Sequence, residues 1–133
     1  MKFIFAMPIL LAGISYAPVV MAVDAAPASK QTEVLQRISV QGTALQMGMG
    51  IADFPPNAEK PRHKAIGPEL AYVLEGELIV LIEGEPPIVL HAGGSYQLAP
   101  NVIHITKAGP AGAKVLATWV TMPGKQFNIA VPR

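Results

Sequence analysis

The amino-acid sequence predicts an all-β protein, built as a sandwich or a barrel of short strands. Twelve glycines and 13 prolines in 133 residues give many turn formers for so short a chain. Apolar runs recur roughly every eight to twelve residues with turn residues between them, a spacing typical of sandwiches and barrels. Beyond residue 23, no stretch keeps a helical period long enough for a crossover helix. The length leaves room for one domain.

The N-terminal segment, residues 1–22, has the pattern of a secretory signal. Lys2 precedes an apolar stretch, and the small residues Val20 and Ala22 stand three and one positions before a cleavage point at Val23. An uncleaved membrane anchor is the alternative, because no charge follows Lys2 in this segment. Two prolines and a glycine weaken a continuous helix there and favour cleavage. We therefore expect an exported protein, periplasmic or extracellular, without stable membrane insertion after cleavage.

The remaining chain is electrically balanced and lacks cysteine. Without residues 1–22, nine basic residues face nine acidic ones, and no basic cluster exists that would indicate a nucleic-acid or anionic-membrane partner. The absence of cysteine excludes disulfides and thiolate metal sites. A small-molecule ligand and a second copy of the chain, forming a homodimer, are the partners that we expect. Residues 23–32 are predicted to be a disordered Ala/Pro-rich lead-in, and residues 33–133 to be the folded domain.

The first strands follow from alternating apolar and polar residues. Residues 33–39 and 44–54 alternate in this way, and Gly42 separates them. Residues 55–69 carry four prolines and most of the local charge, so a loop is predicted there.

Turns containing glycine, or proline and asparagine, separate the other strands, before a Pro/Gly-rich tail. Strands are predicted at 70–74, 78–82, 88–90, 95–98, 103–107 and 114–121, with turns at 75–77, 83–85, 91–94 and 99–101.

Three side chains are candidate metal ligands: His63, Glu69 and His104. His63 ends the Pro-rich loop, Glu69 begins the next strand, and His104 follows a Pro-Asn turn in a later strand. Imidazole and carboxylate groups together suit divalent first-row metals. Their spacing alone is equally consistent with solvated loop residues.

Two longer stretches resemble the motifs of the cupin superfamily. In RHKAIGPELAYVLEGEL, His63 takes the first histidine place, Glu69 the glutamate place and Gly76 the glycine place of the first motif. In LHAGGSYQLAPNVIH, His104 takes the histidine place of the second motif, and Asn101 stands where the family usually has glycine. The resemblance covers about residues 33–125. It implies a small antiparallel β-barrel of the jelly-roll type, also called a double-stranded β-helix.

The departures from the motifs bear on the metal. Ala65 stands in the second histidine place, so the usual set of three histidines and one glutamate is reduced to His63, Glu69 and His104. The resemblance then implies either a divalent transition metal (Fe, Mn, Zn or Ni) with open coordination positions, or a site without metal. Ala108, Gly94 and Ile66 also depart from the family pattern.

Three functions remain open at this point. The first is a metal-dependent enzyme, of the oxygenase or isomerase type, acting on a small organic molecule. The second is a non-catalytic binding or sensing module with a degenerate metal site. The third is a structural role through oligomerisation, in which the apolar run LIVLI at 78–82 forms either a subunit contact or barrel core. The residues identify no catalytic group beyond the candidate ligands.

Other conspicuous side chains have simpler explanations. His91 is expected to be a surface turn histidine, and Arg62 and Lys64 to be solvated loop charges that could steer an anion. Trp119 and Tyr72 are expected in the core or at a subunit contact.

Overall fold

The computed structural model describes residue 18 and residues 25–133, and every regular element in this part of the chain is a β-strand. The all-β prediction is therefore confirmed. The strands are β1 (Glu33–Ser39), β2 (Gln46–Phe54), β3 (Glu59–Ala65), β4 (Glu69–Ile82), β5 (Ile88–His91), β6 (Ser95–Leu98), β7 (His104–Thr121) and β8 (Asn128–Ala130). The predicted signal segment, apart from Pro18, lies outside the described residues. Within them, no helix is long and apolar enough to cross a membrane.

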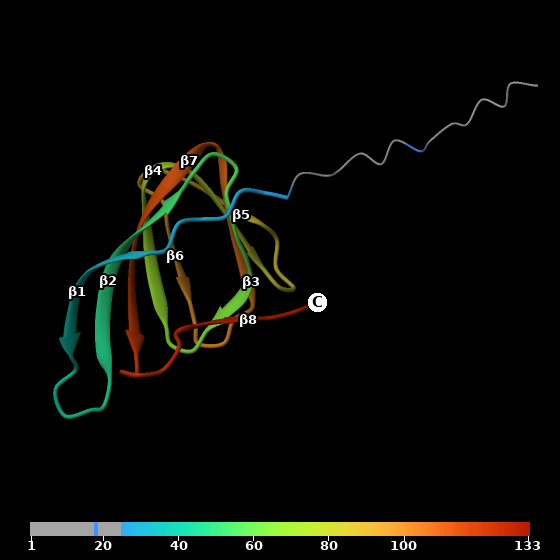
Figure 1. Cartoon of the computed structure of the whole chain (residues 1–133). Coiled ribbons are helices and arrows are strands. Elements are labelled where there is room, and N and C mark those ends of the chain that lie inside the picture. Colours follow the sequence, from blue (N-terminus) through green and yellow to red (C-terminus); the bar gives the residue numbers. More distant parts are fainter. Residues whose placement is uncertain (1–17, 19–24) are drawn as a thin grey trace, which may run out of the picture.

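Two long strands, β4 and β7, connect the two sides of the barrel. They pair antiparallel from Glu69↔Trp119 to Ile82↔His104. The first half of β4 and the second half of β7 form one sheet with β1, β2 and β6. Their other halves form a facing sheet with β3, β5 and β8. Figure 1 shows the strands curling around a common interior, with β1 and β2 on one side and β3 and β8 on the other.

The turn predicted at 75–77 is wrong, because β4 bends there without ending. The β4–β7 register shifts around Gly76, whose φ of 78° lies in the left-handed region. A Cβ atom at this position would lie 2.0 Å from the carbonyl oxygen of Gly112 in β7, so only glycine allows the two strands to approach. The runs predicted at 103–107 and 114–121 are likewise parts of one strand, β7, which continues through Gly109 and Gly112.

The loop predicted at 55–69 is also wrong, because β3 lies within it. Proline lacks a ladder donor and is usually confined to strand edges and bulges. Pro61 obeys this rule: it lies where the β3–β7 register shifts between Lys60 and His63. The predicted tail contains a further short strand, β8, which pairs with β3 from His63 to Ala65.

Residues 27–30 of the lead-in were predicted to be disordered, but the structure places them in contact with β2 and β3. Ala28 forms a parallel bridge with Glu59, and the Lys30 amide donates to the carbonyl of Asp53. The Lys30 ammonium also pairs with the Asp53 carboxylate at 2.7 Å. These bonds fasten the segment across the gap between the end of β2 and the start of β3, and Figure 1 shows it crossing the barrel before β1.

The hydrophobic core lies near the bends of β4 and β7. Its largest fully buried side chains are Leu78, Val73, Val80 and Val115. Burying side chains of this kind contributes about 1.5–3 kcal/mol each. Leu78 and Val80 of the run LIVLI are buried and belong to the core, whereas its other three residues are only partly buried. A subunit contact through this strand stays a prediction. With the core at the bends, the far ends of β4 and β7 are left to form a cavity.

Candidate functional site

The structure brings His63 and His104 together. They are register partners between β3 and β7, and their ring centroids are 4.1 Å apart at an interplanar angle of 54°. Both are almost fully buried, with 5% and 3% of their surface exposed. Two residues that lie far apart in the sequence therefore form one imidazole pair inside the barrel.

Each imidazole ring is held by a hydrogen bond to the backbone carbonyl two residues before it in the chain. Nδ1 of His63 lies 2.7 Å from the carbonyl oxygen of Pro61, and Nδ1 of His104 lies 2.9 Å from that of Val102. A carbonyl oxygen only accepts, so Nδ1 must carry the hydrogen in both rings. In the neutral ring the lone pair is then on Nε2, which is the arrangement that backbone carbonyls impose on metal-binding histidines.

The pair is kept neutral by its surroundings. Burial, with smaller effects from Lys60 and His104, lowers the pKa of His63 to about 4. Burial also lowers the pKa of His104, although the hydrogen bond to Val102 acts in the opposite direction. Both rings are thus unprotonated near neutral pH, as metal coordination requires.

Glu69, the third predicted ligand, lies in the same cavity but has different partners. Burial raises the pKa of its carboxyl group, while Lys60 and a hydrogen bond from Tyr96 oppose that rise. Within the described part of the chain, no three His, Cys, Asp or Glu side chains are grouped so that they could hold a metal ion. The donor set that converges here is therefore the imidazole pair, with Glu69 beside Tyr96.

Ala65 occupies an interior position. Side chains two residues apart in a strand point to the same face, so Ala65 shares the inward face of β3 with His63. Only 2% of its surface is exposed. A histidine at this position would therefore be directed into the barrel beside the imidazole pair, and the alanine removes one interior ligand.

The histidines and Glu69 line a cavity of about 590 Å³ between the two sheets. Some residues that line the cavity are polar or ionisable, and others are apolar. The wall includes Phe54, Val115, Ala117, Trp119 and Phe127. Ser29 to Thr32 of the lead-in also contribute, as do Lys125, Phe127 and Asn128 near the C-terminus. The cavity is large enough for a small organic molecule.

Trp119 forms a flat wall of the cavity because its neighbour in β2 has no side chain. A Cβ atom at Gly48 would lie 2.4–2.6 Å from three atoms of the indole ring. Gly48 thus lets the indole lie against the strand backbone. The ring centroid of Trp119 is 6.1 Å from that of Phe127. Trp119 is therefore a cavity residue. The expected core placement of Tyr72 is wrong, because this side chain is half-exposed on the outer side of β4; a subunit contact there stays a prediction.

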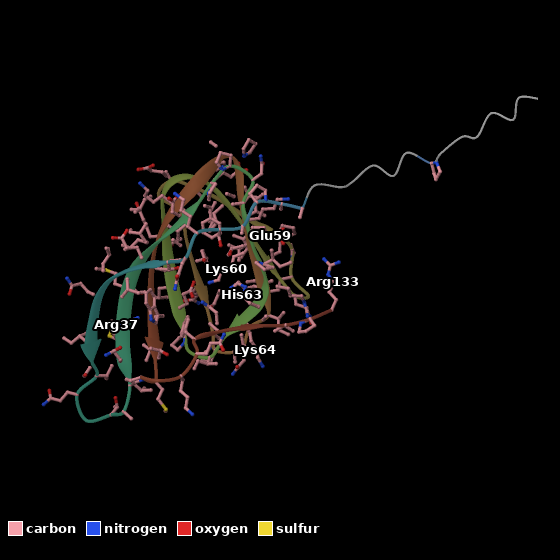
Figure 2. All side chains as sticks on the ribbon, in the orientation of Figure 1. Arg37, Glu59, Lys60, His63, Lys64 and Arg133 are labelled. Carbon is pink, nitrogen blue, oxygen red and sulfur yellow. The ribbon has the colours of Figure 1, made fainter. Side chains whose placement is uncertain are left out.

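Two cavity residues, Lys60 and Tyr96, were missed by the sequence interpretation. The register shift between Lys60 and His63 places both side chains in the cavity although they are three residues apart. Figure 2 shows the two next to each other in the middle of the barrel. Burial lowers the pKa of Lys60, and burial together with Glu69 raises that of Tyr96. No sequence signal reveals the bulge, although Pro61 is compatible with one.

Arg62 has a structural role and is not a free steering charge. Its guanidinium forms an ion pair with Glu83 and donates to the carbonyl oxygens of Val131 at 3.2 Å and Pro132 at 2.7 Å, so it fastens the C-terminal segment. Lys64 is not a cavity residue. The expectation for His91 is confirmed: its side chain is 72% exposed and lies 3.7 Å from the Glu77 carboxylate.

Comparison with known proteins identifies the family. The family model named Cupin domain matches residues 50–120 of the sequence, which is more than half of the chain. The chain belongs to the cupin domain family. This confirms the resemblance drawn from the two sequence motifs, and the match spans His63, Glu69 and His104.

Individual cupins that resemble the chain include lyases. The dimethylsulfoniopropionate lyase DddW of Ruegeria pomeroyi is 35% identical over 85 residues, which are 62% of this chain and 55% of that protein. The chain thus spans about half the length of this relative. Crystal structures of similar fold include the lyase DddQ from Ruegeria pomeroyi, with a TM-score of 0.59, 21% identity and coverage of 64% of this chain and 43% of that one.

An RmlC-like cupin from Shewanella frigidimarina has a TM-score of 0.53 and 26% identity, over 71% of this chain and 87% of that one. The match therefore covers most of that cupin's chain. Together the comparisons show the cupin fold.

Proposed function

We propose that this cupin is a metal-dependent enzyme that acts on a small organic molecule in the cavity between its sheets. His63 and His104 would hold a divalent transition metal, and Glu69 would supply the carboxylate of a two-histidine, one-carboxylate set. The observation that carries the proposal is the buried imidazole pair with both Nδ1 atoms bonded to backbone carbonyls.

The chemistry of this donor pair fits a metal ion. Both rings are neutral and leave Nε2 unprotonated, and their centroids are 4.1 Å apart. Two imidazoles and a carboxylate suit Fe, and Zn is also held by such groups. When bound, the metal would supply Lewis acidity toward a substrate oxygen.

The protein groups beside the pair would handle protons. Burial raises the pKa of Glu69, so its carboxyl group keeps a proton to higher pH than an exposed glutamate would. The Tyr96 hydroxyl, which hydrogen-bonds to it, gives the pair a second exchangeable hydrogen. Glu69 and Tyr96 can therefore hold or transfer a proton at the cavity wall, as acid–base catalysis requires.

The similarity to a dimethylsulfoniopropionate lyase supports an enzyme over a passive binder, and adds a lyase to the oxygenase and isomerase types. Dimethylsulfoniopropionate is therefore the first substrate to try. Elimination from such a compound needs a group that removes a proton. Glu69 would be that group only in its ionised form and when it is not a ligand of the metal.

A non-catalytic binding module is the second candidate, and Ala65 is the observation that favours it. Its methyl group replaces one interior ligand, and no three candidate ligands are grouped for a metal among the described residues. In that case the same cavity would bind a ligand without converting it.

Metal titration and turnover together test the proposal. The protein is purified anaerobically, treated with chelator and titrated with Fe²⁺, Mn²⁺, Zn²⁺ or Ni²⁺. We expect binding of about one ion per chain, weakened at least about tenfold by His63→Ala or His104→Ala. His91→Ala, which removes an exposed histidine, is the matched control.

Acrylate formation from dimethylsulfoniopropionate is then followed with the metal-loaded protein and with Glu69→Gln. Turnover that persists after chelation would contradict the metal proposal, and metal binding without any turnover would favour the binding module.

We also propose that the chain is exported through its N-terminal segment. The pattern of residues 1–22 supports this proposal. Expression of the full chain, fractionation and N-terminal sequencing should recover a protein that begins at Val23 outside the cytoplasm. A protein that retains Met1 in the cytoplasmic fraction would contradict it.

A further inference from the structure

The cavity wall carries more positive than negative charge. Arg37 on β1, Lys60 on β3 and Lys125 after β7 all line it, and Glu69 is the one acidic residue among the described lining residues. Lys30 also lines the cavity, but Asp53 neutralises it at 2.7 Å. Since the histidine pair is neutral, cations outnumber anions in this space.

In the described part of the chain these three cations lack close ion-pair partners, although Glu69 lies near enough to Lys60 to act on its pKa. Within residues 25–133, none of them forms an ion pair or a side-chain hydrogen bond. Lys60 is the innermost, beside His63 in the middle of the barrel, whereas Arg37 lies on the β1 side (Figure 2). Burial makes the ammonium form of Lys60 less favourable and lowers its pKa, and the nearby Glu69 offsets this cost only in part. A bound anion would offset that cost.

We propose that the ligand of this cavity is a small organic acid whose carboxylate binds the ammonium group of Lys60. Arg37 and Lys125 attract the anion to the cavity, in the way that surface potentials concentrate a charged ligand. The proposal shares its cavity with the proposed function but does not depend on a metal.

The apolar part of the wall favours a carboxylic acid with a short hydrocarbon chain over inorganic phosphate. Trp119 and Phe127 form an aromatic wall with ring centroids 6.1 Å apart, and Phe54, Val115 and Ala117 add further apolar surface. A single interior ammonium group suits the charge of one carboxylate. Phosphate would bring more charge and no apolar surface to match this wall.

Trp119 makes the proposal measurable, because it is the single tryptophan of the chain and lines the cavity. Chelator-treated full-length protein is titrated with butyrate, butyramide and inorganic phosphate, and the indole fluorescence is followed. We expect saturable binding of butyrate, with butyramide and phosphate at least about tenfold weaker. Equal binding of butyrate and butyramide, or no saturation by butyrate up to about 50 mM, would overturn the proposal.

Variants on β3 assign the binding to Lys60. Lys60→Met keeps the hydrocarbon stem and should weaken butyrate binding about ten- to a hundredfold. Lys60→Arg keeps the charge and should bind within about threefold of the wild type. Lys64→Met removes the same charge from the same strand outside the cavity and should change binding less than about twofold. Unchanged binding in a folded Lys60→Met protein, or an equal loss in Lys64→Met, would overturn the assignment.

The expected butyrate binding does not require a metal, because the protein is treated with chelator before the titration. These results are therefore expected even if the metal proposal fails. Conversely, a protein that binds metal but not butyrate would refute this inference alone.

Discussion

Acid should destabilise this protein through His63, and the size of the effect follows from its burial. In the unfolded chain the histidine takes up a proton near pH 6.5, whereas in the folded state its pKa is about 4. Between these values the unfolded state binds more protons, so the free energy of unfolding falls as the pH falls. Each pH unit in this window costs about 1.4 kcal/mol, so His63 alone should remove about 2 kcal/mol by pH 5.

The variant His63→Gln isolates this contribution, because glutamine does not titrate. Urea denaturation is measured in chelator from pH 8 to pH 5, with circular dichroism as the probe. The free-energy difference between wild type and variant should shrink by about 2 kcal/mol over this range. Glu69, whose folded pKa is raised, acts in the opposite sense but is present in both proteins. His91→Gln serves as the exposed control. A difference that stays constant within about 0.5 kcal/mol would refute the reasoning.

Two further predictions concern the bend of β4 and the proton pair. Gly76→Ala should cost at least about 3 kcal/mol, because its Cβ atom would lie 2.0 Å from a carbonyl oxygen of β7. Gly84→Ala, with a similar φ of 80° but open space around it, should cost only about 1 kcal/mol, and equal urea midpoints would contradict this account. Tyr96→Phe should raise the pKa of Glu69 as measured by carboxyl NMR, because a hydrogen bond that favours the ionised form is lost. The variant Tyr72→Phe, which changes an outward-facing tyrosine, should leave the pKa of Glu69 unchanged. Equal pKa values of Glu69 in the two variants would contradict a hydrogen bond between Glu69 and Tyr96.

The barrel could be predicted from short apolar runs, but the ends of several strands could not. Glycine ends many strands, so Gly76 suggested a turn, yet β4 bends through it because β7 bends at the same level. Proline and charge suggested a loop at 55–69, yet Pro61 lies at a bulge where its missing donor costs nothing. Whether such residues end a strand or bend it depends on the partner strand, which local sequence does not specify.

The candidate site could be predicted only in part. The motif spacing identified His63, Glu69 and His104, and the register of β3 against β7 brings the two histidines together. The same spacing could not show that Lys60 enters the cavity, because a regular strand would point Lys60 and His63 to opposite faces. The bulge reverses this, so the charge of the cavity is a property of the fold and not of the motif.

Metal content tests the central claim most directly. Wild type and Ala65→His are purified anaerobically and analysed for transition metals before and after reconstitution. If His63 and His104 with Glu69 form a working site, the wild type should hold about one ion per chain and Ala65→His should only tighten it. Less than about a tenth of an ion in the wild type, with about one ion in Ala65→His, would contradict the account.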